Sequence, residues 1–171
     1  MKTNTSLFNR TAWILGAFVS VAGFASANPL SGHSDKSFVE KAAKKGMEEV
    51  SISQVVAERS TNPQVKEFAT MMVADHSAAN TELSALAASK GIALPAKETA
   101  PGKWSKKTGK DFDEDYMEKM TEDHDEAVKL FNKEASDGKD QDIVAFARKT
   151  LPTLQHHQQM AKDLKKALKG K

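Results

Sequence analysis

The chain contains no cysteine among its 171 residues. Disulfide bonds and thiolate chemistry, including thiolate metal ligands, are therefore excluded. The sequence also lacks a Ser-His-Asp order, a phosphate-binding loop and a nucleophile elbow. Without these motifs, the sequence favours a protein that is not an enzyme.

No apolar run reaches the roughly 20 residues that a bilayer span needs. Residues 11–24 form a shorter apolar run, which follows two basic residues and precedes an A-x-A site ending at Ala27. This order predicts a signal peptide over residues 1–27, cleaved after Ala27, and a periplasmic or secreted protein with no stable membrane span after cleavage. A retained membrane anchor is the alternative.

The protein that remains after cleavage has no excess of charge. The signal peptide holds two of the 25 basic residues and none of the 23 acidic residues, so the remaining charges balance. A basic binding face is not supported, and nucleic acid is excluded as a partner. We expect residues 28–36 to form a flexible N-terminus ahead of the folded domain.

No stretch of useful length alternates like a strand, and four segments have helical periodicity instead. They cover residues 38–60, 63–90, 112–136 and 141–169. The sequence therefore predicts one all-α domain over residues 37–169.

The starts of these helices are predicted from capping residues. Ser37 with Glu40 forms an S-x-x-E capping box, and Asp111 with Glu114 occupies the same positions before the third helix. Pro152 lies inside the fourth segment, where it is expected to kink the helix or mark a bulge.

The connections predict how the helices are arranged. Short turns join the helices of each hairpin, whereas residues 91–110 form a crossover rich in proline, glycine and lysine that we expect to contain no helix. The hairpins resemble each other: a shift of 74 residues aligns Phe38 with Phe112, and a shift of 78 aligns Phe68 with Phe146. The pattern favours a ferritin-like four-helix bundle with up-down-down-up topology, and an up-down-up-down bundle is the alternative.

Polar residues interrupt the apolar stripes at mid-helix. The pattern M-x-x-D-H-x-x-A occurs at residues 72–79 and again at 120–127. At 1.5 Å rise per residue, His76 and His124 each lie about 21 Å from the turn of their own hairpin, whereas His157 lies about 28 Å from its turn. The helix rise thus predicts that His157 is offset by one helical turn, and a kink at Pro152 that brings it level is the alternative.

Buried carboxylates and imidazoles cost several kcal/mol unless they are paired or metal-bound. One interpretation is a site for divalent iron, manganese or zinc, since carboxylate and imidazole suit these ions. The other is a polar layer that fixes helix register, with one member of each Asp-His pair facing water. Val73 and Thr121 stand where a di-iron Glu-x-x-His motif requires glutamate, which disfavours oxidase chemistry. The candidate ligands are Glu49, Asp75, His76, Asp123, His124 and His157.

Two motifs carry a resemblance to a known family. The sequence reads N-P-x-V-K-x-F-A from residue 62 and M-V-A-D-H from residue 72. With the segments at 37–83 and 149–164, these motifs resemble the bacterial family named domain of unknown function 4142, over about residues 36–168. The resemblance implies a ferritin-like four-helix fold in a secreted or periplasmic setting, and it implies no established activity.

Two functions remain open at this point. The first is a periplasmic ferritin-like protein that binds a divalent metal at its mid-bundle layer. The second is a non-catalytic envelope or stress-related module whose buried polar layer is structural and whose crossover and outer faces bind a protein or a glycan, with Trp104 as a candidate contact. The sequence does not predict an oligomeric state.

Overall fold

The computed structural model describes residues 34–96, 102–106 and 108–170, and the predicted signal peptide and residues 28–33 lie outside this part. The described residues belong to one compact unit. They form four long helices and one short helix, without a strand in the described ranges. The prediction of an all-α four-helix domain is confirmed.

The first helix, α1 (Asp35–Arg59), starts three residues earlier than its capping box predicts. Ser34, not Ser37, is the N-cap, and its hydroxyl accepts a hydrogen bond from the amide of Ser37 at 3.1 Å. The carboxylate of Asp35 accepts hydrogen bonds from the backbone at the far hairpin's turn, including the amide of Asp140 at 2.7 Å. This tertiary contact anchors the helix start, and no local sequence pattern records it.

The second helix, α2 (Pro63–Ser89), agrees with the predicted segment 63–90 to within one residue. The Asn62 side chain accepts from the amide of Gln64 at 3.0 Å, and Pro63 is the first helical residue. Gly91 follows the helix with a φ of 65°, a left-handed conformation that glycine adopts without steric cost.

The second hairpin consists of α4 (Lys110–Asp137) and α5 (Gln141–Lys169). Gly109, with a φ of 77°, precedes α4, and the predicted cap Asp111 instead lies in the first turn. A carboxylate there still favours the helix start, because the N-terminal end of the helix dipole is positive. Helix α5 begins as predicted and continues through Pro152.

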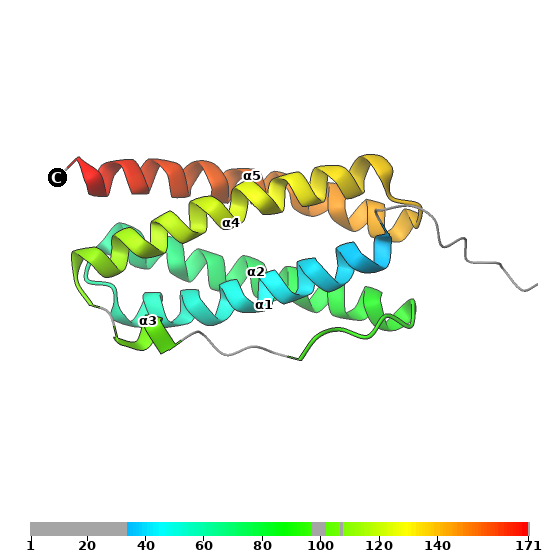
Figure 1. Ribbon diagram of the computed structural model, residues 1–171, viewed down its shortest axis with the longest axis horizontal. Coiled ribbons are helices and arrows are strands. Elements are labelled where there is room, and N and C mark those ends of the chain that lie inside the picture. Colours follow the sequence, from blue (N-terminus) through cyan, green and yellow to red (C-terminus); the bar gives the residue numbers. More distant parts are fainter. Residues whose placement is uncertain (1–33, 97–101, 107, 171) are drawn as a thin grey trace, which may run out of the picture. The chain divides into compact units, whose positions relative to one another are not determined.

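Contacts at the two ends of the bundle establish the topology. The start of α1 and the end of α2 both meet the α4–α5 turn, through the Asp35 contact and through Lys90 Nζ at 2.8 Å from Asp140 Oδ2. At the opposite end, Arg59 donates to the Trp104 carbonyl at 3.0 Å. Helices α1 and α5 therefore run in one direction and α2 and α4 in the other (Figure 1). The up-down-down-up topology is confirmed.

The crossover contains a short helix, α3 (Gly102–Lys106), so the expectation of a crossover without a helix is wrong. The Trp104 ring is 2% exposed and packs against Phe112 and Tyr116, with centroid distances of 6.1 and 6.2 Å. Burial of this large aromatic side chain holds α3 against the bundle. The same burial removes the Trp104 ring from the surface, where a glycan contact would need it.

The core has two apolar halves with a polar layer between them. The half nearer the α1–α2 turn contains Phe68, Trp104, Phe112, Tyr116 and several methionines. The half nearer the α4–α5 turn contains Phe38, Leu83, Phe131, Phe146 and Leu154. The residues buried between them include Glu49, His76, His124 and His157.

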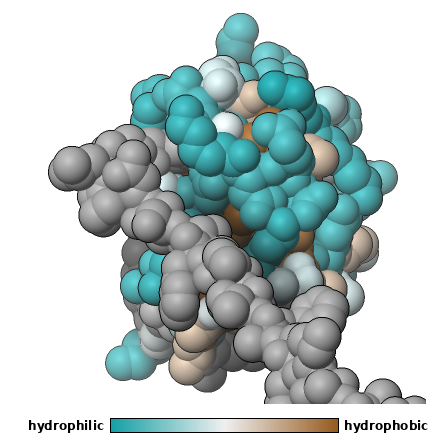
Figure 2. Space-filling model, turned by 90° about the vertical axis from the view of Figure 1, so that its right-hand side faces the viewer, coloured by the Kyte–Doolittle hydropathy of each residue, from teal (hydrophilic) through white to brown (hydrophobic). Residues whose placement is uncertain are grey.

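Hydrophilic residues cover most of the described surface at the end of the bundle where α1 begins, and hydrophobic residues show between them (Figure 2). None of the helices in the described part is long and apolar enough to cross a membrane.

Candidate metal centre

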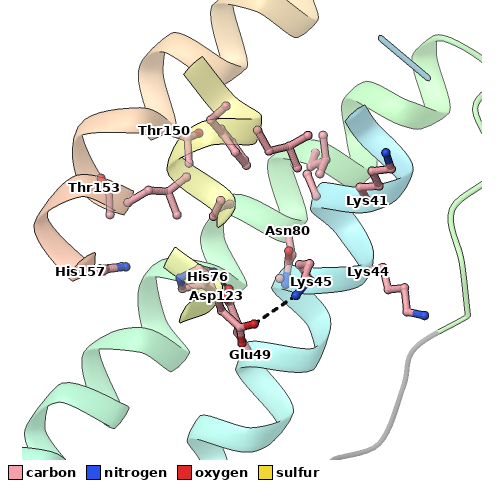
Figure 3. A pocket seen from close by; sticks show the side chains of 18 of the residues that line it. Lys41, Lys44, Lys45, Glu49, His76, Asn80, Asp123, Thr150, Thr153 and His157 are labelled. Carbon is pink, nitrogen blue, oxygen red and sulfur yellow. Dashed lines mark hydrogen bonds and ion pairs between the residues drawn. The ribbon is translucent and has the colours of Figure 1, made fainter. Parts of the chain in front are cut away.

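Three histidines from three different helices meet in the polar layer. His76 of α2 is 6% exposed, and His124 of α4 and His157 of α5 are fully buried. Their ring centroids are 5.3 to 5.5 Å apart. Each ring offers one nitrogen such that the three nitrogens lie within 4.8 Å of one another. The three histidines therefore form one cluster in the middle of the bundle (Figure 3 shows His76 and His157).

The predicted offset of His157 is absent, since its ring lies 5.5 Å from the ring of His124. Helix geometry accounts for the difference, because every Cα–Cβ bond tilts toward the N-terminus of its helix. Helices α4 and α5 are antiparallel, so His157 leans back toward their common turn and His124 leans away from it. The two tilts bring the rings to the same level.

In two of the three histidines, one ring nitrogen contacts a carboxylate. His76 Nδ1 lies 3.0 Å from Glu49 Oε2, and His157 Nε2 lies 2.9 Å from Asp75 Oδ2. An ionised carboxylate only accepts hydrogen bonds, so each of these nitrogens carries the proton. Glu49 and Asp75, both predicted as candidate metal ligands, lie where they orient the imidazoles of His76 and His157.

A backbone carbonyl does the same for the third histidine. His124 Nδ1 lies 2.9 Å from the carbonyl oxygen of Met120, which also only accepts. The remaining nitrogens are His76 Nε2, His124 Nε2 and His157 Nδ1, all buried and without a hydrogen-bond partner within the described ranges. Each histidine thus has one nitrogen fixed by an acceptor and one nitrogen without a hydrogen-bond partner among the described residues.

The Glu49–His76 pair is charged. Burial by itself would raise the pKa of Glu49, but the charge and hydrogen bond of His76, together with the charge of Lys45, lower it to about 2. Burial would likewise lower the pKa of His76, and the Glu49 carboxylate outweighs burial and raises it. Removing either partner would leave a buried charge without its counter-ion, which costs about 3–5 kcal/mol.

The other two histidines are held neutral. Burial lowers the pKa of His124, with a further contribution from the charge of His76. Burial and the charge of His76 also lower the pKa of His157, to about 4, although its hydrogen bond to Asp75 opposes the shift. Neutral imidazole is the form that binds metal ions.

Asp123 does not join the cluster, although the sequence places it next to His124. Its carboxylate lies 3.1 Å from Lys45 Nζ and 2.8 Å from Lys119 Nζ. Figure 3 marks the contact with Lys45. Adjacent residues of a helix point about 100° apart, so only one of the two can face the centre of the bundle.

The sequence did not identify the small residues next to the histidines as part of the site. The final alanines of the two M-x-x-D-H-x-x-A motifs, Ala79 and Ala127, border a cavity beside the histidine layer. Their repeated position three residues after each histidine is the pattern that could have identified them.

Comparisons with known proteins identify the family. The model of the family described as "Domain of unknown function (DUF4142)" matches residues 19–164. The crystal structure of a DUF305 fragment from Deinococcus radiodurans is similar in fold, with a TM-score of 0.67 and 12% sequence identity, over 78% of this chain and 95% of that chain. At this identity the likeness shows the fold alone. None of the curated proteins matches the chain. Since the family model matches most of the chain, this protein belongs to the family of domain of unknown function 4142.

Proposed function

We propose that this protein binds one divalent transition-metal ion through His76 Nε2, His124 Nε2 and His157 Nδ1. One observation carries the proposal: the three buried nitrogens have no hydrogen-bond partner within the described part of the chain, and each is the free side of an imidazole whose other side is fixed. Histidine ligands of metal ions are held in this way, with the second nitrogen donating to a carboxylate or a carbonyl.

The donor set favours an ion that accepts imidazole. Three neutral imidazoles suit zinc and iron, and manganese remains a candidate because the Glu49 carboxylate borders the layer. In tetrahedral zinc sites the nitrogens lie about 2.0 to 2.1 Å from the ion and hence about 3.4 Å apart. One nitrogen from each of the three rings lies within 4.8 Å of the others, which is close to the spacing that such a site needs.

A purely structural layer explains less of what is observed. The charged Glu49–His76 pair fixes the helix register, and this pair needs only one of the three histidines. The unbonded nitrogens of His124 and His157 would each cost about 1–3 kcal/mol as buried polar atoms without a partner. A bound metal ion removes this cost.

Metal analysis tests the proposal directly. The protein is purified without a His-tag, incubated with zinc, iron(II) or manganese(II), desalted and analysed for metal by mass spectrometry. We expect about one equivalent of one of these ions in the wild type and almost none in a His76→Ala, His124→Ala double variant.

The matched control is His156→Ala, because His156 is exposed on α5 next to His157. This variant should retain the wild-type metal content. Equal metal contents in the wild type and the double variant, whether near zero or not, would leave the polar layer as a structural feature only.

A further inference from the structure

A cavity of about 480 Å³ adjoins the histidine layer on the side of the α4–α5 turn. Glu49, His76 and His157 border it at the layer (Figure 3). Its apolar walls include Leu83, Phe131, Phe146 and Leu154. Protein interiors contain few voids larger than a water molecule, and small-molecule sites begin at about 300 Å³. The cavity therefore has the size of a ligand site.

The two copies of the repeated motif lie between the half of the core that contains the cavity and the half that large side chains fill. Helices α2 and α4 run in the same direction, so the two copies of M-x-x-D-H-x-x-A point the same way. Their methionines, Met72 and Met120, are completely buried in the half that large aromatic residues fill. Their alanines, Ala79 and Ala127, border the cavity, which Gly46 of α1 also lines. The two alanines thus leave this space open, whereas the side chain of Asn80 occupies the space next to Gly46.

The charges around the cavity disfavour an anionic ligand. Three lysines and five carboxylates border it. One of the lysines, Lys45, lies 3.1 Å from both Asp123 and Glu126. At the histidine end, the carboxylates of Glu49 and Asp75 border the cavity. Because carboxylates outnumber lysines around the cavity, an anionic head group is disfavoured relative to a neutral one.

We propose that this cavity binds a small neutral amphipathic molecule of the aliphatic alcohol class. The chain lies against Leu83, Phe131 and Leu154, and the hydroxyl group lies at the histidine end. At that end the carboxylate of Asp75 and the side-chain amide of Asn80 also border the cavity, and a hydroxyl group can pair with either. Burial of the chain does not require the proposed metal ion.

Binding of straight-chain alcohols to the full protein tests this proposal. 1-Butanol, 1-hexanol and 1-octanol are titrated by calorimetry into metal-free protein and into protein preincubated with zinc. Each buried CH2 group should tighten binding about fourfold, so each step in the series should give about 16-fold. Octanoate should bind at least tenfold more weakly than 1-octanol. Failure of all three alcohols to bind metal-free protein would overturn the proposal, whether or not zinc binds.

Filling the cavity provides the matched variants. Ala79→Leu should weaken 1-octanol binding at least tenfold, and Ala127→Leu, from a different helix, should do the same if Ala79→Leu fails to fold. Ala78→Leu is the control, because Ala78 is exposed on the same helix and does not line the cavity. Equal weakening by the control, or unchanged binding in a folded cavity variant, would place the alcohol elsewhere and overturn the proposal.

Discussion

The three histidines of the cluster differ in their charge. His76 forms an ion pair with Glu49. His124 and His157 are neutral, because burial lowers the pKa of each. A metal ion approaching the cluster thus meets two imidazoles that are already deprotonated at one nitrogen. The third must lose a proton first, which makes binding weaker at low pH.

Asp75 should matter for metal binding without contacting the metal. Its carboxylate is 44% exposed and fixes the His157 ring by the 2.9 Å hydrogen bond. Asp75→Ala should lower zinc affinity about 10- to 100-fold, the usual effect of losing such a partner. Competition with a chelating dye measures the affinity. Asp125→Ala is the control, because Asp125 is 41% exposed and pairs with Lys162 instead. Equal affinities in the two variants would show that Asp75 does not position the ligand.

At the scale of the elements, close packing of helices depends on residues with no chemistry of their own. Gly46 of α1 faces Asn80 of α2, and a Cβ on Gly46 would lie 3.1 Å from Asn80 Cγ and closer still to its Oδ1. Both residues line the cavity. Glycine is accepted inside α1, where it costs about 1 kcal/mol relative to alanine, because the neighbouring helix needs this space.

A double-mutant cycle on these two helices tests that explanation. Gly46→Ala in the wild type should give no gain in the free energy of unfolding or a small loss, because the methyl group displaces Asn80. In an Asn80→Ala background the same substitution should raise the free energy of unfolding by about 1 kcal/mol, the difference in helix propensity. Urea unfolding measures both. The same effect in both backgrounds would mean that Asn80 does not restrict this position.

For the whole molecule, the polar layer makes stability depend on pH. The folded-state pKa of His157 is lowered to about 4, mainly by burial, against about 6.5 in an unfolded chain. Between these values the unfolded chain binds a proton that the folded protein does not, so stability falls as pH falls. His124 contributes in the same direction. His76 contributes in the opposite sense: its raised pKa adds stability that is lost as pH rises above about 6.5.

We therefore expect metal-free protein to be most stable near neutral pH. Its free energy of unfolding should fall by up to about 3 kcal/mol between pH 6.5 and 4 from His157 alone. Further acidification removes the contribution of Glu49, whose pKa is lowered to about 2 by His76 against burial. Urea unfolding across this range measures the slope. In a His157→Gln variant the slope should be smaller, and a wild-type slope in that variant would contradict the assignment.

Much of the fold was predictable because its signals are local. Helical periodicity and the short turns defined two hairpins, and the helix starts predicted at residues 63 and 141 agree with the structure. The caps predicted at Ser37 and Asp111 were displaced. In α1 a contact from Asp35 to another hairpin extends the helix beyond the local capping pattern.

The sequence by itself determined that polar residues interrupt four inward stripes at mid-helix, because periodicity reports which face of a helix is buried. Only the tertiary structure decided that three histidines meet, since the level of His157 relative to His124 depends on side chains that tilt in opposite directions on two antiparallel helices. The tertiary structure also showed which imidazole nitrogens have no partner among the described residues and which are held by a carboxylate or a carbonyl. It further revealed a cavity next to the histidines. These outcomes depend on distances between helices, which a one-dimensional pattern does not contain.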